Sequence, residues 1–244
     1  MALLLWGGLC ADTIRIRSGV WEPFHGVAGS PQPGIIIEIA SNAFQKAGHR
    51  LDYQNLPWSC SIDLARSGEI DGVVGASIPN VPDFVFPKNE QAMNVNVFYT
   101  RKGNPWRYEG LPSLAGKRVG IIQDYLFTED FDAYVRKNKG NGDLIQIVAG
   151  MDALRQNLLK LENRRIDAYL DDRLVIEHFL MKSGRAGLFQ EAGAIGRVPI
   201  FMAFSPARPQ SRAYAAILSA AMETMRESGE LARLLARYHT VDWR

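Results

Sequence analysis

The 244-residue chain has little cysteine, no long apolar run and almost no excess of charge. Two cysteines, Cys10 and Cys60, exclude the disulfide framework of a small secreted domain. No apolar run approaches the ~20 residues of a membrane-spanning helix. The 28 Lys and Arg residues are nearly balanced by 26 Asp and Glu residues, and no run of basic residues is longer than a pair such as Arg164-Arg165. We therefore expect a globular protein without a nucleic-acid partner.

Sequence motifs of catalysis are also missing. The four histidines, His25, His49, His178 and His239, include no pair at the spacing of helical metal ligands. The sequence has no Gly-x-Ser-x-Gly elbow, no Gly-x-x-x-x-Gly-Lys-Ser/Thr loop and no Gly-x-Gly-x-x-Gly turn that opens a helix. We therefore predict no metal, no cofactor and no enzymatic activity.

The first eleven residues form a short apolar segment that ends in a small residue, Ala11. This segment resembles a shortened secretory signal without its basic start. We predict that residues 1–11 are removed, that the mature chain begins near Asp12, and that the protein is exported to the periplasm. A buried first strand or an apolar tail is the alternative interpretation. A lipid anchor on Cys10 is disfavoured because Leu9 is larger than the small residue that precedes such a cysteine.

Strand and helix patterns alternate from residue 14 onward. Alternating or continuous apolar residues predict strands over 14–17, 51–56, 70–76, 95–99, 118–122 and 166–170. Apolar residues at helical spacing predict helices over 35–47, 59–66, 128–135, 152–161, 174–181 and, with an interruption at Gly229, 212–238. Ser59 or Ser61 is expected to cap the second helix. This alternation indicates an α/β fold with parallel strands.

A short internal similarity suggests that the chain contains two copies of one plan. Ile70-Asp71-Gly72 and Ile166-Asp167-Ala168 each end a predicted helix and open a predicted strand. Such a short match is weak on its own, but the shared context favours a structural repeat.

Polar and aromatic residues follow the predicted strands at their carboxyl ends, where open α/β sheets bind ligands. In the first half of the chain these residues are Trp21, Glu22, Phe24, Trp58 and Ser77. In the second half they are Asp124, Tyr125, Asp171, Asp172 and Arg173. Two such sets that face each other would line a cleft between two lobes.

Each candidate residue also has a purely structural interpretation. Trp21 and Trp58 are large aromatic residues of the kind that pack in cores. Asp171 is explained most simply as the N-cap of the following helix. Asp172, one residue later, is less easily explained as a cap, so we predict that Asp172 is the ligand-binding carboxylate of the two.

Five segments in order resemble one known family. They are Trp21-Glu-Pro-Phe24, the stretch from Pro33 to Gly48, the stretch from Leu64 to Ala76, Leu114-Ala-Gly-Lys-Arg-Val-Gly120, and Arg165-Ile-Asp-Ala-Tyr-Leu-Asp-Asp172. From Ile14 to His239 the chain resembles the bacterial extracellular solute-binding proteins of the polar amino acid type. This resemblance implies an α/β, two-lobed periplasmic binding protein fold of type II, with two crossover segments and a hinge that closes over the ligand.

The lobe boundaries follow from this resemblance and from the predicted elements. Lobe 1 is expected to comprise residues 12–100 and 204–244, and lobe 2 residues 105–195. The segments 101–104 and 196–203 are the expected hinges.

The resemblance also implies roles for individual residues. An aromatic side chain at Trp21 or Phe24 would pack on the ligand, Asp172 would receive its amino group, and the start of the first lobe 2 helix would receive its carboxylate. Two departures weaken the last role. The segment 77–83 lacks the arginine that relatives carry there, which Arg101 or Arg173 would have to replace. Asp124 stands in the carboxylate-binding turn, where it would repel an anion.

We therefore predict a monomeric, non-catalytic protein that captures an amino acid or a related amine and delivers it to an inner-membrane ABC permease. A dehydratase-like enzyme on the same fold is one alternative, although the missing arginine and Asp124 argue against it. A sensory or interaction module, in which the two lobes report occupancy to another protein, is the other alternative.

Overall fold

The computed structural model describes residues 11–123, 125–150 and 152–244, so most of the predicted signal segment lies outside the described residues. The described residues form two compact units. Unit 1 comprises those of Met1–Met93 and Pro199–Arg244, and unit 2 comprises those of Asn94–Val198. The chain changes unit within two long strands, β4 (Ala92–Arg101) and β8 (Phe189–Phe204).

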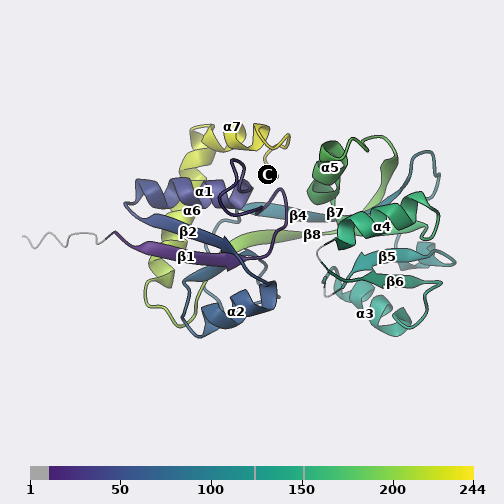
Figure 1. The fold of residues 1–244 in the computed structure, drawn as a ribbon, viewed down its shortest axis with the longest axis horizontal. Helices are drawn as coiled ribbons and strands as arrows, with labels where there is room; N and C mark the ends of the chain where they lie inside the picture. Colours follow the sequence, from purple (N-terminus) through teal and green to yellow (C-terminus); the bar gives the residue numbers. More distant parts are fainter. Residues whose placement is uncertain (1–10, 124, 151) are drawn as a thin grey trace, which may run out of the picture. The chain divides into compact units, whose positions relative to one another are not determined.

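Unit 1 begins with a βαβαβ segment. Its elements are β1 (Thr13–Ser18), α1 (Ile35–Lys46), β2 (Arg50–Asn55), α2 (Trp58–Arg66) and β3 (Gly72–Ala76). β1 lies between β2 and β3 and is parallel to both, and β8 then pairs with β3 in the antiparallel sense. The helices α1 and α2 cover opposite faces of these strands (Figure 1).

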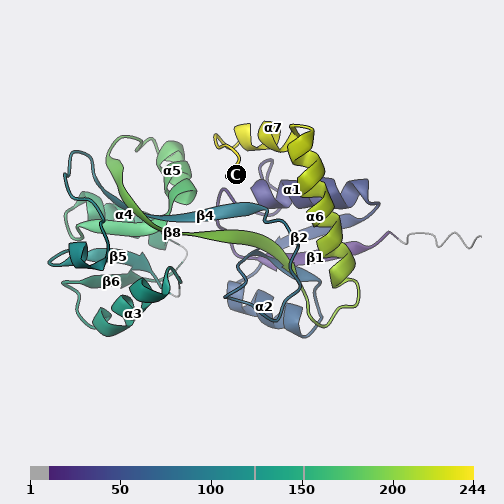
Figure 2. The same ribbon diagram turned by 180° about the vertical axis from the view of Figure 1, so that it is seen from behind.

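The C-terminal part of the chain also belongs to unit 1. It forms α6 (Ser211–Glu227) and α7 (Glu230–Ala236), and both helices contact α1 (Figure 2). Gly229 separates them with a φ of 69°, a left-handed conformation that glycine adopts without the penalty of a side chain. The interruption predicted at this residue is therefore confirmed.

Unit 2 repeats the plan of unit 1. It contains the 3-10 helix η1 (Leu111–Leu114), β5 (Val119–Ile122), α3 (Glu129–Asn138), β6 (Ile145–Val148), α4 (Ala153–Glu162), β7 (Ala168–Asp172) and α5 (Arg173–Lys182). β5 lies between β6 and β7 and is parallel to both, and β4 pairs with β7 in the antiparallel sense. The strand order β6-β5-β7-β4 thus matches β2-β1-β3-β8.

The two short matching segments occupy equivalent places in the two units. Asp71 accepts a hydrogen bond from the backbone N–H of Arg15 at 2.7 Å, and its own N–H donates to the carbonyl of Arg15 at 2.9 Å. Asp167 accepts from the backbone N–H of Arg118 at 3.0 Å and donates to the carbonyl of Arg118 at 2.8 Å. Asp71, before β3, therefore holds β1 in unit 1, and Asp167, before β7, holds the start of β5 in unit 2 in the same way.

Several local predictions need correction. α2 begins at Trp58, with Pro57 as its N-cap, so neither Ser59 nor Ser61 caps it. The Ser61 hydroxyl instead donates back to the carbonyl of Pro57 at 3.0 Å. The strands β6 and β8 were not predicted. No helix among the described residues is long and apolar enough to span a membrane.

Candidate functional site

The loop after β1 in unit 1 is closed by its own backbone. Trp21 and His25 exchange two backbone hydrogen bonds, of 2.7 and 3.1 Å. Phe24 is buried, and its ring centroid lies 4.6 Å from that of Trp21. The indole Nε1 of Trp21 is buried but has no hydrogen-bond partner among the described residues. A buried donor without a partner is uncommon and is therefore available to a bound molecule.

His25 fixes this loop against the sheet. Its ring lies against Gly75, where an added Cβ would come within 2.4 Å of the ring nitrogen Nε2, so only glycine fits. Burial lowers the pKa of His25 to about 4, and the carbonyl of Gly19, 3.1 Å from Nδ1, offsets this only in part. His25 is therefore neutral at physiological pH. The spacing of the histidines in the sequence gives no sign of this structural role of His25.

The remaining unit 1 candidates differ in their surroundings. Glu22 folds back over Gly26, where an added Cβ would lie 3.3 Å from its Cγ. Trp58 is half-buried and packs against a core cluster that includes Ala65 and Val73. Ser77 is buried directly after β3. The structure therefore brings Trp21 and Phe24 into contact with each other, and a ligand role for Glu22, Trp58 and Ser77 stays a prediction.

Two adjacent carboxyl groups end β7 in unit 2. One oxygen of Asp171 accepts from the hydroxyl of Tyr169 and the other from the backbone N–H of Asp172, at 2.7 Å. Asp172 Oδ1 accepts from the N–H of Val175 at 2.9 Å, and Oδ2 from the N–H of Val95 at 2.8 Å. Asp171 and Asp172 are each only 1% exposed.

The assignment of the helix cap to Asp171 was wrong. β7 continues through Asp172, and α5 begins at Arg173, so the N-cap is Asp172 and not Asp171. Strand alternation then turns Asp171 toward Tyr169 instead of toward the helix. The cap does not exclude a ligand role for Asp172, which stays a prediction.

The two carboxyl groups, which we call the acidic pair, have raised pKa values, so their neutral forms are favoured. Burial raises the pKa of Asp171 to about 6, although the Tyr169 and Asp172 hydrogen bonds oppose this. Burial also raises the pKa of Asp172 to about 7, against the N–H groups of Val175 and Val95, and the charge of Asp171 adds to the increase. A cation placed beside the pair would stabilise its ionised form.

Tyr125 and Arg173 flank the acidic pair differently. The pKa of Tyr125 is raised first by burial and then by the charges of Asp171 and Asp172. The residue is nevertheless 36% exposed. Arg173 forms two hydrogen bonds of 2.7 Å with Glu191. Asp124 lies outside the described residues.

Both arginines considered as substitute carboxylate receptors have partners within the protein. Arg173 is paired with Glu191, and a ligand role for Arg173 stays a prediction. Arg101 donates to the carbonyl of Leu161 at 2.8 Å, at the C-terminal end of α4. That helix end lies beside the start of β7, whereas the acidic pair ends the same strand. The suggestion that Arg101 receives a ligand carboxylate is therefore wrong.

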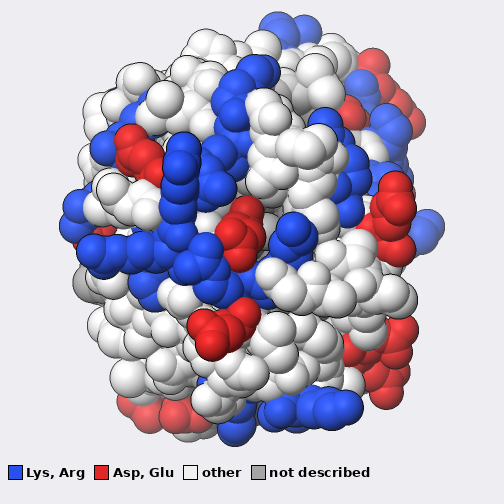
Figure 3. Space-filling view, turned by 90° about the vertical axis from the view of Figure 1, so that its right-hand side faces the viewer, with Lys and Arg blue, Asp and Glu red and all other residues white. Residues whose placement is uncertain are grey.

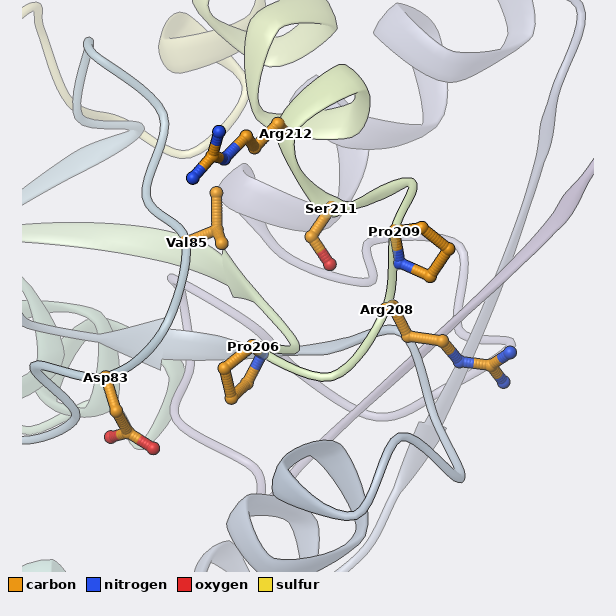
Figure 4. Close-up of a pocket in the computed structure, with 7 residues that line it drawn as sticks. All are labelled: Asp83, Val85, Pro206, Arg208, Pro209, Ser211 and Arg212. Atoms are coloured by element: carbon orange, nitrogen blue, oxygen red, sulfur yellow. The ribbon is translucent and has the colours of Figure 1, made fainter.

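One open pocket of about 480 Å³ lies in unit 1, but it holds none of the predicted ligand residues. It is lined by Asp83, Val85, Pro206, Arg208, Pro209, Ser211 and Arg212 (Figure 4). Figure 4 shows the two guanidinium groups pointing away from each other. Phe204 pairs with Gly72, the first residue of β3, so this pocket lies at the amino end of the parallel strands. Ligands of open α/β sheets bind at the opposite end.

Among the described residues no cluster of His, Cys, Asp and Glu could hold a metal.

Solved structures share this fold. A histidine kinase sensor domain with similarity to periplasmic binding proteins superposes with a TM-score of 0.71 at 16% identity, covering 94% of this chain and 96% of that one. A mutant of ArgBP from T. maritima has a TM-score of 0.70 at 18% identity, covering 93% and 95%. The arginine-, lysine-, histidine-binding protein ArtJ from Geobacillus stearothermophilus has a TM-score of 0.70 at 15% identity, covering 95% and 97%.

These likenesses confirm the two-lobed α/β fold of type II periplasmic binding proteins, which the motifs implied. No curated protein matches the chain in sequence. The sequence profile of one family matches residues 17–241, which is most of the chain, and confirms the resemblance drawn from the motifs. The chain belongs to the bacterial extracellular solute-binding proteins, family 3.

Proposed function

We propose that this chain is an exported, non-catalytic binding protein that captures a small ligand carrying a protonated amine and delivers it to an ABC permease. The acidic pair carries the proposal. Asp171 and Asp172 are buried together at the carboxyl end of a parallel strand, and Arg173, the next residue, is paired with Glu191. An ammonium or guanidinium group would supply the positive charge that the pair lacks.

The charges at this end of unit 2 favour a cation over an isolated carboxylate. Tyr125 and Tyr169 both feel the charge of Asp171, which raises their pKa values after the larger effect of burial. An anion placed here would meet the same repulsion. Proteins of the same fold whose names state an arginine or lysine ligand agree with this preference, although at 15–20% identity they support the fold alone.

A thermal-shift and calorimetric screen tests the ligand class directly. We expect arginine, lysine and 1,4-diaminobutane to stabilise the protein more than glutamate or succinate does. Because the pair must lose its protons to bind a cation well, affinity should rise between pH 5.5 and 7.5 and binding should release protons. Equal affinity for anions and cations would contradict the proposal.

A matched pair of variants locates the site. Asp172→Asn keeps an oxygen for the N–H of Val175 but removes the charge, so affinity should fall by roughly ten- to a hundredfold. Asp167→Asn removes a carboxylate that lies before the other end of β7 and should leave affinity unchanged. If both variants bind as the wild type does, the acidic pair is not the ligand site.

The transport role is separable from binding. We propose that the protein is periplasmic, with residues 1–11 removed, and mass spectrometry of envelope material should find a chain that starts near Asp12. A dominant form that retains Met1 in the cytoplasm would contradict export. Stimulation of a reconstituted permease by the liganded protein would support delivery.

A sensory role is the second candidate, because a histidine kinase sensor domain has the same fold with a TM-score of 0.71. It predicts that the liganded protein changes the phosphorylation of a receptor kinase and leaves permease activity unaltered. The two roles share the acidic pair, so the binding screen does not distinguish them but the two activity assays do.

A further inference from the structure

Six basic residues gather at one end of unit 2, around the C-terminal end of α4. We call this set the basic end; its members are Arg101, Lys102, Lys160, Arg164, Arg165 and Arg185. The guanidinium of Arg101 bonds to the carbonyl of Leu161 in the last turn of α4. The backbone N–H of Arg165 bonds to the carbonyl of Lys160 at 2.8 Å. These contacts hold four of the six within about one helical turn of each other.

The other two members are joined to α4 through the loop after α5. Arg185 forms an ion pair with Glu162 at 2.9 Å. Its carbonyl accepts from the N–H of Leu188 at 3.2 Å, and the carbonyl of Leu188 accepts from the N–H of Lys102 at 2.9 Å. Residues far apart in the sequence thus form one contiguous surface.

The basic end is strongly unbalanced in charge. Among the described residues Glu162 is the one carboxylate that forms an ion pair with it, so six cations and one anion give a local charge of +5. The whole chain carries only +2. Close by, Arg118 does not add to this excess because it is paired with Asp167 at 3.0 Å. Figure 3 shows Lys and Arg side chains gathered over part of the drawn face, with Asp and Glu side chains among them.

Three of the six cations are exposed and have no partner within the described residues. Lys102, Arg164 and Arg165 lie at the surface, and no hydrogen bond or ion pair within the described residues engages their side chains. Like charges held together repel each other and lower the stability of the folded state. An external anionic partner would remove that cost.

Apolar side chains project from the same surface. Leu188 is 44% exposed and lies between Arg185 and Lys102 in the chain of backbone bonds described above. Met181 is 45% exposed in the last turn of α5, and its carbonyl accepts from the N–H of Gly184 at the start of the same loop. A basic surface with protruding apolar side chains matches the boundary between lipid headgroups and acyl chains.

We propose that the basic end binds a surface of anionic phospholipid headgroups. Arginine binds phosphate through two parallel hydrogen bonds, and lysine adds a mobile point charge. The apolar side chains of Leu188 and Met181 would enter the region just below the headgroups, which a soluble acidic protein does not offer. This inference concerns a surface of unit 2 that is separate from the acidic pair and does not depend on the ligand.

Vesicle co-sedimentation of the full chain tests the proposal. The full chain should bind vesicles of phosphatidylcholine with phosphatidylglycerol and should not bind vesicles of phosphatidylcholine alone, and high salt should weaken the binding. Each surface cation contributes about a fivefold change in binding, so Arg164→Gln/Arg165→Gln should weaken it about 25-fold. Leu188→Ser should weaken it by about fivefold.

Two control variants keep the test specific. Arg136→Gln/Lys137→Gln removes two adjacent exposed cations from α3, and Ile147→Ser removes an exposed apolar side chain from β6. Both should bind vesicles as the wild type does, and thermal melts verify that every variant is folded. Equal binding to neutral vesicles, equal loss in the two double variants, or binding to polyglutamate without binding to anionic vesicles would each overturn the proposal.

Discussion

The two units share a strand order and an aspartate, Asp71 or Asp167, that bonds to the first strand and that we call the aspartate clamp. They differ in the groups that they bury near the carboxyl ends of their strands, which are a base in unit 1 and two acids in unit 2. Unit 1 buries His25, whose pKa falls to about 4. Unit 2 buries Asp171 and Asp172, whose pKa values rise to about 6 and about 7. Burial disfavours the charged form in both cases, so it acts with opposite sign on a base and on an acid. One architecture thus provides a neutral, aromatic strand end in unit 1 and an acidic one in unit 2.

This difference predicts opposite pH dependence in the two units. Between pH 4 and 6.5 the unfolded chain protonates His25 more readily than the folded chain does, so the stability of unit 1 rises with pH. The folded chain holds protons on the acidic pair up to about pH 7, whereas the unfolded chain loses them near pH 4, so the stability of unit 2 falls over that range. Hydrogen exchange measured peptide by peptide should show these two trends.

The largest expected effect is that substitution of the acidic pair removes the fall in the stability of unit 2 with rising pH. Each pKa unit corresponds to about 1.4 kcal/mol, so the pair should destabilise unit 2 by on the order of 5 kcal/mol between pH 4.5 and 7.5. Asp171→Asn/Asp172→Asn should abolish this loss and leave the trend of unit 1 intact. His25→Gln should do the reverse. A pH profile of unit 2 that survives the double substitution would contradict the assignment.

The second prediction compares the two aspartate clamps. The side chain of Asp71 is 10% exposed and also lies 3.4 Å from Arg208, whereas that of Asp167 is 27% exposed. Asp71→Ala should therefore cost about 3 kcal/mol, since it leaves buried donors without a partner. Asp167→Ala should cost about 1 kcal/mol because water can replace part of its role. Urea unfolding measures both, and equal costs would show that the difference in burial does not matter.

The third prediction concerns helix caps in unit 2. Asp172 accepts from the N–H of Val175, whereas Thr128, the N-cap of α3, makes no side-chain cap bond. At pH 5 Asp172→Ala should cost about 1–2 kcal/mol and Thr128→Ala less than about 0.5 kcal/mol. At pH 7.5 the cost of Asp172→Ala should shrink, because the substitution also removes a buried charge. An unchanged cost across this range would mean that Asp172 ionises as easily as in water.

The sequence predicted most elements of both units because their signals are local. Apolar spacing predicted α1, and the φ of 82° at Gly48 matches the helix end expected there. The β8 strand carries no such signal. Gly193, Gly196 and Pro199 interrupt its sequence, and its pairing with β3 and β4 in the sheet makes it a strand. Long-range pairing overrode local propensity in this segment.

The candidate site was predictable in place but not in detail. Strand ends pointed to the residues of the acidic pair, because that rule depends only on topology. A one-residue error at the end of β7 placed the helix cap on Asp171 instead of Asp172, and each step along a strand reverses the direction of the side chain. The ion pair between Arg173 and Glu191, 18 residues away, depends on tertiary contacts that the spacing of residues in the sequence does not reveal.

The smallest expected effect sharpens the comparison at the tryptophans of the two units. Trp21 in unit 1 has a buried indole N–H without a partner among the described residues, whereas Trp106 in unit 2 donates to the carbonyl of Ser113 at 3.0 Å. Trp21→Phe should change the free energy of unfolding by no more than about 1 kcal/mol, because the lost ring area is offset by removal of an unsatisfied donor. Trp106→Phe should cost about 1 kcal/mol, because it leaves an acceptor unpaired. If the unpaired N–H of Trp21 donates to the ligand, Trp21→Phe should lower affinity about fivefold while Trp106→Phe leaves it unchanged. Calorimetry with a ligand from the screen measures both affinities, and equal values in the two variants would make Trp21 a packing residue only.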